Sequence, residues 1–262
     1  MLVTTPDDAR LAEQFELSVV IPALNEADRL PPTLDRIGAY LDAHPDWRPA
    51  EIIVVDDGSS DGTAAAAACV DLPHGIDLRV AEHPNNLGKG AAVRTGFRLA
   101  VGRWVLLTDA DLSAPIEELP VLARAASRGS VAVGSRAVER RLVETPQPRH
   151  RDMMGRTFNL MLRMLRLTGI RDTQCGFKLF PGELARALPG VQRIDGFTFD
   201  VELLLLASSW GFEVNEIGVR WNHVEASRVM AVKHSMEMFG DTLRLCWWRA
   251  LGKLAPRPRV LE

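Results

Sequence analysis

Acidic side chains gather at two points of the sequence where a short apolar run has just ended. Asp56 and Asp57 follow the run EIIVV, and Asp109 and Asp111 follow WVLLT. Capping a helix uses one carboxylate, and DGSSDGT is typical of a turn into a helix at Asp61. Neighbouring carboxylates, however, repel each other unless a cation or hydroxyl groups lie between them. We therefore favour a polar site that takes a cation, hydroxyl groups or both.

A second segment, LGKGAA around Lys89, must be compared with known phosphate-binding loops. It matches G-x-G-x-x-G only in part and follows no apolar run directly, and the pattern G-x-x-x-x-G-K-[ST] is absent from the sequence. Those two patterns hold the phosphates of dinucleotides and of nucleoside triphosphates. The sequence therefore disfavours a dehydrogenase or an ATPase.

The elements that would position these residues alternate regularly through the first half of the chain. Short apolar runs are separated by segments in which apolar residues recur at helical spacing. Such alternation predicts a parallel sheet covered by helices. In open sheets of this kind, ligands bind beyond the carboxyl ends of the strands, where the acidic pairs lie. The predicted strands are LSVVIP, EIIVV, DLRVAE, WVLLT and SVAVG, and the predicted helices are 29–43, 61–70, 89–101 and 115–127.

Composition excludes several classes of protein. The chain has 262 residues, of which 47% are hydrophobic and 25% charged, so it can bury a large core and is neither disordered nor fibrous. Its three cysteines are far apart without a C-x-x-C pair, which argues against a disulfide framework or a zinc site. It contains no apolar signal segment and no run of about 18 apolar residues, so we expect a protein that is neither secreted nor membrane-spanning.

Charge is distributed unevenly along the chain. Residues 1–120 carry 9 Lys and Arg against 20 Asp and Glu, whereas residues 121–262 carry 22 against 14. Two basic amphipathic segments, 149–171 and 232–251, lie in the basic half. Each has an apolar stripe that suits either core packing or membrane contact, and Trp247 beside Trp248 favours an interface for the second. The pattern is typical either of ordinary variation of surface charge or of a protein with a cation-binding half and an anion-facing half.

The motifs VVIPALNE, VVDDGSSDGT and TDADLS occur in this order with NNLGKGAAVRTGF, GSR and DTQCGFKLF. Together they resemble the family-2 glycosyltransferases, in the branch of dolichyl-phosphate and polyprenyl-phosphate sugar synthases, over about residues 17–230. TDADLS and DTQCGFKLF are most similar to the dolichyl-phosphate beta-glucosyltransferase subgroup. The resemblance implies an α/β GT-A fold, Rossmann-like, with a mostly parallel sheet flanked by helices. We expect an N-terminal tail at 1–16, the catalytic domain at 17–230, and an amphipathic C-terminal helix with a basic tail at 231–262.

The resemblance also assigns the donor side of the site. Asp111 is the metal candidate for a divalent cation, Mg or Mn, joined by Asp109 and by Ser113, where related mannosyl synthases have a glutamine. A cation there neutralises the charge that grows on a departing diphosphate. If the strand before Asp109 continues, Asp109 and Asp111 point to opposite sides. The expected nucleotide-sugar-binding residues are Pro22, Asn25, Glu26, Asp56, Asp57, Lys89, Asp109 and Ala110.

The acceptor side falls in the basic half. An arginine fork suits phosphate oxygens, and the resemblance places the acceptor phosphate at Arg136, Arg149, Arg151, Ser227 and Arg228. A phosphate monoester is already anionic near neutral pH, with a second pKa of roughly 6, so positioning is the main catalytic effect. Asp200 or Glu202 is the base or orients the acceptor, and spacing does not choose between them. The expected catalytic residues are Asp111, Arg136, Asp200, Glu202 and Arg228, with Asp172, Gln174, Gly176 and Lys178 in the sugar pocket.

The sequence thus predicts an enzyme that moves a hexose, with glucose favoured, from a UDP-sugar to a polyprenyl phosphate with inversion. The alternatives are a family-2 transferase with a soluble or glycan acceptor and a non-catalytic nucleotide-sugar-binding protein. We expect a cytoplasmic protein, peripheral at the inner face of the cell membrane. It would be held there by anionic lipid or by a small membrane recruiting protein, and we expect no nucleic-acid partner.

Overall fold

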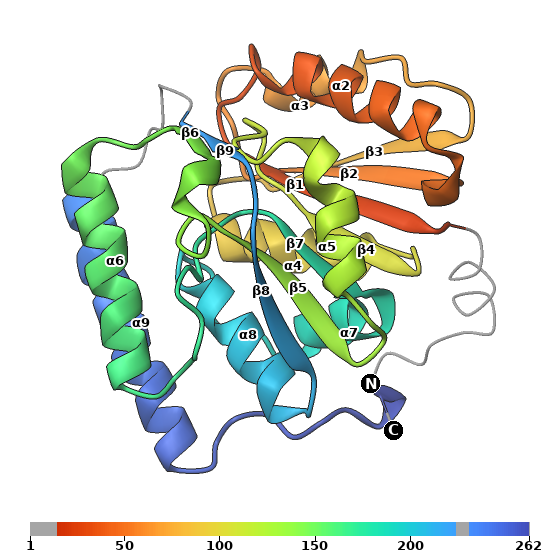
Figure 1. The fold of residues 1–262 in the computed structure, drawn as a ribbon. Helices are drawn as coiled ribbons and strands as arrows, with labels where there is room; N and C mark the ends of the chain where they lie inside the picture. Colours follow the sequence, from red (N-terminus) through yellow and green to blue (C-terminus); the bar gives the residue numbers. More distant parts are fainter. Residues whose placement is uncertain (1–14, 224–230, 262) are drawn as a thin grey trace.

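The computed structural model describes residues 15–223 and 231–261. Its centre is a seven-stranded sheet with the order β3-β2-β1-β4-β7-β5-β8 (Figure 1). Strand β7 runs antiparallel to both of its neighbours, and the remaining pairs are parallel. The prediction of a mostly parallel α/β sheet is confirmed. The strands are β1 (Leu17–Ala23), β2 (Ala50–Asp56), β3 (Ile76–Glu82), β4 (Trp104–Leu107), β5 (Ser130–Ser135), β7 (Lys178–Pro181) and β8 (Glu213–Gly218).

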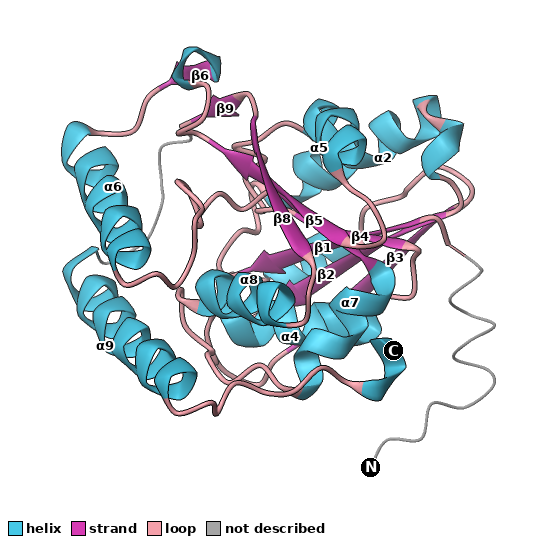
Figure 2. Ribbon diagram, turned by 60° about the horizontal axis from the view of Figure 1, so that its bottom comes forward, coloured by secondary structure: helices cyan, strands magenta, loops and turns pink. Residues whose placement is uncertain are grey.

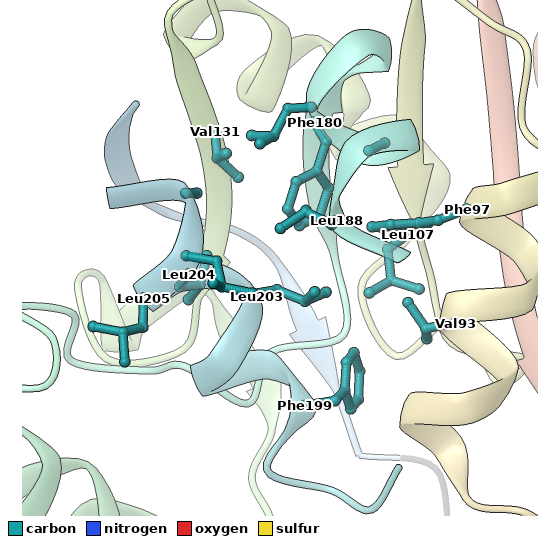
Figure 3. Close-up of a cluster of buried hydrophobic side chains, with 14 of the residues drawn as sticks. Val93, Phe97, Leu107, Val131, Phe180, Leu188, Phe199, Leu203, Leu204 and Leu205 are labelled. Carbon is teal, nitrogen blue, oxygen red and sulfur yellow. The ribbon is translucent and has the colours of Figure 1, made fainter. Parts of the chain in front are cut away.

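The central strands are buried on both faces, which explains their almost continuous apolar runs. In β1, Val20 belongs to one core cluster while Val19 and Ile21 belong to the other, because successive side chains of a strand point to opposite faces. Figure 3 shows part of the first cluster, where Phe97 and Phe180 pack edge to face with ring centroids 5.2 Å apart. The sheet therefore holds the two layers of helices together.

Helices cover both faces of the sheet (Figures 1 and 2). The first core cluster joins the sheet to α4 (Lys89–Leu99), α7 (Gly182–Ala187) and α8 (Phe199–Ser209). The second joins it to α2 (Leu30–Ala43), α3 (Thr63–Ala68) and α5 (Leu119–Ala125). Short 3-10 turns occur at η1 (Pro45–Trp47), η2 (Ile116–Glu118), η3 (Arg140–Leu142), η4 (Leu188–Gly190) and η5 (Arg259–Leu261).

Two long helices lie side by side at one end of the molecule, α6 (Arg149–Met164) and α9 (Ala231–Ala250) (Figures 1 and 2). They occupy most of the two basic amphipathic segments. Leu162 of α6 and Leu245 of α9 belong to the first core cluster, as does Leu261 near the C-terminus. The chain after residue 230 therefore packs into the same core as the sheet.

The outward faces of α6 and α9 carry several exposed apolar side chains. Phe158 and Trp248 pack against the core, whereas Trp247 is 57% exposed. Among the side chains that the structure describes, the exposed apolar ones of the two helices are Met153, Met154, Leu160 and Met164 on α6, with Met236, Phe239, Leu243 and Trp247 on α9. None of the helices in the described part of the chain is long and apolar enough to span a bilayer.

A small two-stranded sheet stands near the start of α6. It pairs β6 (Val143–Thr145) with β9 (Trp221–Asn222). This pairing brings the segment that follows β8 beside the loop that follows β5. Strands β5 and β8 are parallel, so both end at the same edge of the large sheet. The polar residues of the candidate active site lie at that edge.

Candidate active site

The acidic pair at the carboxyl end of β2 makes hydrogen bonds within the protein. Asp57 is 3% exposed, and its carboxylate accepts hydrogen bonds from the backbone N–H groups of Leu87 (3.0 Å) and Gly88 (2.8 Å). Its Oδ1 also lies 2.8 Å from Nδ1 of His83. The Asp56 carboxylate accepts from the backbone N–H of Ser59 at 3.0 Å. In this structure the pair holds the loops before α3 and α4, and its contact with a nucleotide stays a prediction.

The loop after β1 is tied to the same region. The backbone N–H of Asn25, at φ 55°, donates to Oγ of Ser59 (2.8 Å), and Oδ1 of Asn25 accepts from the backbone N–H of Ser60 (3.0 Å). The N–H of Glu26 donates to Oγ1 of Thr63, which lies at the start of α3, at 2.8 Å. Pro22, the first predicted donor-side residue, is buried inside β1. The carboxyl ends of β1 and β2 thus form one connected wall.

The second acidic pair is more open. Strand β4 ends at Leu107, and the chain then turns, with Leu112 at φ 44°. Asp109 and Asp111 therefore lie in a turn, and the alternation expected for a continuing strand does not apply to them. The side chain of Asp109 is 33% exposed, and its Oδ1 accepts from Nζ of Lys89 at 2.7 Å. Lys89 begins α4, so the pair joins the first turn of that helix to the end of β4.

Asp111 is the carboxylate of this pair that forms no ion pair with any described residue. Its Oδ1 accepts from the backbone N–H of Ser113 at 2.9 Å. Burial, and then the negative charge of Asp109, raise its pKa above the usual range. Burial opposes the charge on Lys89, but Asp109 and Asp200 outweigh it, so the pKa of Lys89 is raised. Asp109 and Asp111 together carry more negative charge than Lys89 neutralises. Carboxylate oxygens are suitable ligands for a hard divalent cation.

The backbone of Ala110, between the two carboxylates, is held by a hydrogen bond from α2. It is 4% exposed, and its backbone carbonyl accepts from Oγ1 of Thr33 on α2 at 2.7 Å. Ser113, proposed as a further cation ligand, is 6% exposed. The turn that carries Asp109 and Asp111 is therefore fixed by buried contacts on both sides.

The segment DTQCGFK, residues 172–178, packs against this turn. A Cβ atom added at Gly176 would lie 2.0 Å from Oδ2 of Asp109, so the backbone at this position leaves no room for a side chain. Lys178 is fully buried, and its ammonium donates to Oδ1 of Asp200 and, at 2.6 Å, to the carbonyl of Cys175. Burial raises the pKa of Asp200 although Lys178 acts to lower it. The amide of Gln174, which precedes Cys175, has a buried Nε2 that makes no hydrogen bond to any described residue.

Glu202 has a different environment from Asp200, although both lie in the first turn of α8. Its two oxygens accept from the backbone N–H groups of Arg193 (3.0 and 3.1 Å) and Ile194 (2.8 Å). Asp200 instead lies within electrostatic reach of Lys89 and Asp109. Glu202 therefore holds the loop before α8, while Asp200 faces the charged cluster.

Arg136, at the end of β5, forms a two-pronged ion pair with Asp172. The distances are 2.7 Å from Nε to Oδ2 and 2.8 Å from Nη2 to Oδ1. Asp172 is 5% exposed at its side chain, and although burial would raise its pKa, Arg136 holds it below the usual range. The guanidinium also lies over the ring of Trp221, 5.3 Å from its centroid. Sequence reasoning had assigned Arg136 to the acceptor and Asp172 to the sugar pocket, and the structure pairs them.

Glu216 of β8 orients this pair. Its Oε1 accepts from Oγ of Ser135 (2.7 Å) and from the backbone N–H of Asp172 (2.8 Å), and its Oε2 accepts from the N–H of Arg171 (2.9 Å). The end of β5 and the segment 171–172 are therefore bound to one side chain.

A surface pocket opens beside the Arg136–Asp172 pair. The described residues that line it include four arginines and two aspartates, and α6 supplies one wall. Sequence reasoning missed several of these residues, although the i, i+3, i+4, i+7 spacing from Asp152 to Asn159 along α6 places them on one face. The charged and polar lining residues are Arg136, Arg140, Gln147, Asp152, Arg156, Asn159, Arg171 and Asp172.

Other residues predicted for the acceptor are only partly described. Arg149 is exposed at the first position of α6. Arg151 lies in the same helix, but its side chain is outside the described part of the structure, and Ser227 and Arg228 fall in 224–230, also outside it. Their contact with a phosphate stays a prediction.

Known proteins are similar in sequence to this chain over most of its length. The sequence model of glycosyl transferase family 2 matches residues 18–188. The chain is 36% identical to a dolichyl-phosphate beta-glucosyltransferase of Drosophila melanogaster, over 90% of this chain and 76% of that protein. It is 34% identical to the human dolichyl-phosphate beta-glucosyltransferase, over 87% of this chain and 74% of that protein.

Solved structures share the fold. Glucosyl-3-phosphoglycerate synthase from Mycobacterium tuberculosis, in complex with Mn2+, UDP-glucose and phosphoglyceric acid, superposes with a TM-score of 0.59 at 20% identity, covering 94% of this chain and 85% of that chain. Mannosyl-3-phosphoglycerate synthase from Rubrobacter xylanophilus gives 0.61 at 21% identity, covering 96% and 81%.

Proposed function

The chain belongs to glycosyl transferase family 2, and we propose that it transfers glucose from UDP-glucose to a polyprenyl phosphate, giving a polyprenyl-phosphate glucose with inversion at the anomeric carbon. Relatives named dolichyl-phosphate beta-glucosyltransferase, at 34–36% identity over most of both chains, support this donor and acceptor. A soluble or glycan acceptor is not favoured by these relatives.

One observation carries the proposal. The segment 172–178 touches both halves of the site, because Asp172 holds Arg136 while Gly176 lies against the Asp109 carboxylate. Asp109 and Arg136 are close enough to influence each other electrostatically. An anion-binding pocket therefore lies next to an acidic cluster, as required when an acceptor phosphate must approach a nucleotide sugar held beside a cation.

On the donor side, Asp111 is the proposed cation ligand, with Asp109 and Ser113 beside it. A divalent cation bound there supplies positive charge that stabilises the leaving diphosphate. Lys89 contributes a fixed positive charge at the same place, because it is paired with Asp109 at 2.7 Å. We propose the connected wall of Pro22, Asn25 and Glu26, with Asp56 and Asp57, as the support for the nucleotide.

On the acceptor side, the phosphate needs orientation more than deprotonation. Its second pKa is roughly 6, so one oxygen is already anionic near neutral pH and attacks the anomeric carbon as UDP leaves. Asp200 is the better candidate than Glu202 for a residue beside the reacting groups, because the Glu202 oxygens already hold three backbone bonds. Asp172, Gln174, Gly176 and Lys178 shape the proposed sugar pocket.

We propose that the protein meets its lipid acceptor as a peripheral membrane protein at the inner face of the membrane. The exposed apolar side chains of α6 and α9, such as Met164 at 76% and Trp247 at 57%, point away from the core. Exposed basic side chains lie on α9 with them, including Arg244 and Arg249. Apolar burial and attraction to anionic lipid would act together. The alternative is recruitment by a small membrane protein.

The test is a transfer assay with the purified protein. UDP-glucose, UDP-N-acetylglucosamine and GDP-mannose are each incubated with polyprenyl phosphate or with the matching polyprenol, in Mg2+ or Mn2+. We expect nucleotide release and a glucosylated lipid phosphate only with UDP-glucose and the phosphate acceptor. Equal transfer to polyprenol, or transfer only to soluble hydroxyl acceptors, would contradict the proposal.

A further inference from the structure

We propose that Arg140 and Arg156 form a phosphate subsite in the acceptor pocket, and that Asp152 is its resident counter-ion, which the incoming phosphate displaces. The inference rests on the proposed function, because it takes the acceptor to be a phosphate monoester. It adds residues that neither the sequence motifs nor the relatives assign to the acceptor.

The geometry is that of a carboxylate held between two guanidinium groups. Oδ2 of Asp152 lies 3.1 Å from Nη2 of Arg140 and 3.2 Å from Nε of Arg156. Arg140 comes from the short turn η3 and Arg156 from α6, so two separate elements converge on one oxygen. A carboxylate in this position occupies the place where a phosphate oxygen would bind both groups.

Exposure separates this carboxylate from the other one in the pocket. The side chain of Asp152 is 39% exposed, with Arg140 at 48% and Arg156 at 56%. Asp172 is buried and held by Arg136 through two hydrogen bonds. Exposed ion pairs are weak, whereas breaking a buried pair is costly. Exchange of the counter-ion is therefore expected at Asp152, with the Arg136–Asp172 pair left intact.

The charge of the pocket favours this exchange. Its described lining contains four arginines and two aspartates, a net charge of two positive while Asp152 is in place and of three positive once Asp152 has turned away. A phosphate monoester carries about −1.5 to −2 near neutral pH. When Asp152 turns away, the two guanidinium groups present their donors to the phosphate while Arg136 stays in place beside Trp221.

The test compares three variants of the whole protein, Arg140→Gln, Arg156→Gln and Asp152→Asn. Binding of farnesyl phosphate and of farnesol is measured directly, and transfer from UDP-glucose to farnesyl phosphate is measured as KM and kcat. Each arginine variant should weaken farnesyl phosphate binding and raise its KM about tenfold, with kcat and farnesol binding little changed. Asp152→Asn should do the opposite and lower that KM about two- to fivefold, because the competing carboxylate is gone.

Matched controls lie on α2, which contributes no residue to the lining of the pocket. Arg36→Gln removes an exposed arginine that pairs with Glu117 at 2.9 Å, and Asp42→Asn removes an exposed carboxylate that pairs with Arg48 at 2.8 Å. Neither should alter farnesyl phosphate binding. Circular dichroism of each variant checks that the fold is retained.

The outcomes separate this inference from the proposed function. If the wild type transfers glucose to farnesyl phosphate but the arginine variants bind it normally, or Asp152→Asn binds it more weakly, the subsite is wrong. If the wild type binds farnesyl phosphate with the expected responses to substitution but transfers no glucose, the subsite stands and the proposed activity is wrong. If the wild type neither binds nor glucosylates farnesyl phosphate, both are wrong.

Discussion

Nζ of Lys89, at the start of α4, lies 2.7 Å from Oδ1 of Asp109, at the end of β4. Lys89 neutralises the carboxylate of Asp109. The other carboxylate of the acidic pair, Asp111, has a pKa that is raised by burial and by the negative charge of Asp109. Lys89 and Asp111 therefore have separate tasks. The lysine fixes the turn, and Asp111 is the carboxylate that we propose as the cation ligand.

Asp111→Asn should reduce turnover a hundredfold or more, on the order of 3 kcal/mol at the transition state, because the cation that stabilises the leaving diphosphate is held less firmly. The fold should be retained. The measurement is the rate of UDP release with saturating UDP-glucose and lipid phosphate, with and without EDTA. Near-normal activity of the variant, or wild-type activity in excess EDTA, would sink the cation assignment.

The raised pKa of Asp111 also predicts a pH dependence of stability. A carboxyl group with a folded pKa above its unfolded value favours the folded state while it is protonated, and this contribution is lost as pH rises through the folded pKa. In EDTA, Asp111→Asn should therefore gain stability relative to the wild type as pH increases from about 4. Thermal unfolding between pH 4 and 8 checks this. A difference in Tm that is constant at all pH values would contradict the assignment.

Added Mn2+ should raise the wild-type Tm more than that of the variant.

Gly176→Ala should abolish most transfer, because the new methyl group would collide with the Asp109 carboxylate, 2.0 Å from its Oδ2. Gly169→Ala, in the same connection between α6 and β7, meets no atom within 4 Å and is the matched control. Activity and UDP binding by calorimetry are measured for both. Equal activities in the two variants would show that the contact does not constrain the donor site.

Arg136→Ala should raise the KM for lipid phosphate while leaving UDP binding largely intact, since Arg136 is assigned to the acceptor side. It should also lower the free energy of unfolding by about 3 kcal/mol, because Asp172 is left buried without its partner. The double variant Arg136→Ala with Asp172→Asn should recover much of that stability but not the KM. Calorimetry showing loss of UDP binding in the double variant would overturn the division into donor and acceptor sides.

Trp247→Glu and Leu243→Glu should weaken binding to vesicles that contain anionic lipid, because both side chains are more than half exposed on α9 and would bring negative charge to the surface. Ala65→Glu, at an exposed position of α3, is the control for added charge. Sedimentation with anionic and neutral vesicles at low and high salt measures this. Failure of the wild type to bind under any condition, with activity retained in detergent, would favour a membrane recruiting protein.

The sequence by itself determined the frame of the fold and the kind of site. Apolar runs such as EIIVV, followed by Asp56 and Asp57, predict a strand buried on both faces with polar groups at its carboxyl end, and β2 has this form. This works because burial on both faces and the helical spacing of apolar residues are local properties of the chain. The family motifs are also short stretches of sequence, so the expected activity could be inferred from them without the tertiary structure.

Only the tertiary structure decided which charges meet. Arg136 and Asp172 are 36 residues apart, and their pairing depends on Glu216 of β8 holding both segments. A periodic pattern of residues does not predict such a contact, because the contact depends on the order and register of the strands. The same holds for Asp57, whose oxygens are taken by the backbone of a loop 30 residues later. Sequence types therefore indicate which groups are available, and packing decides which of them are left to bind a ligand.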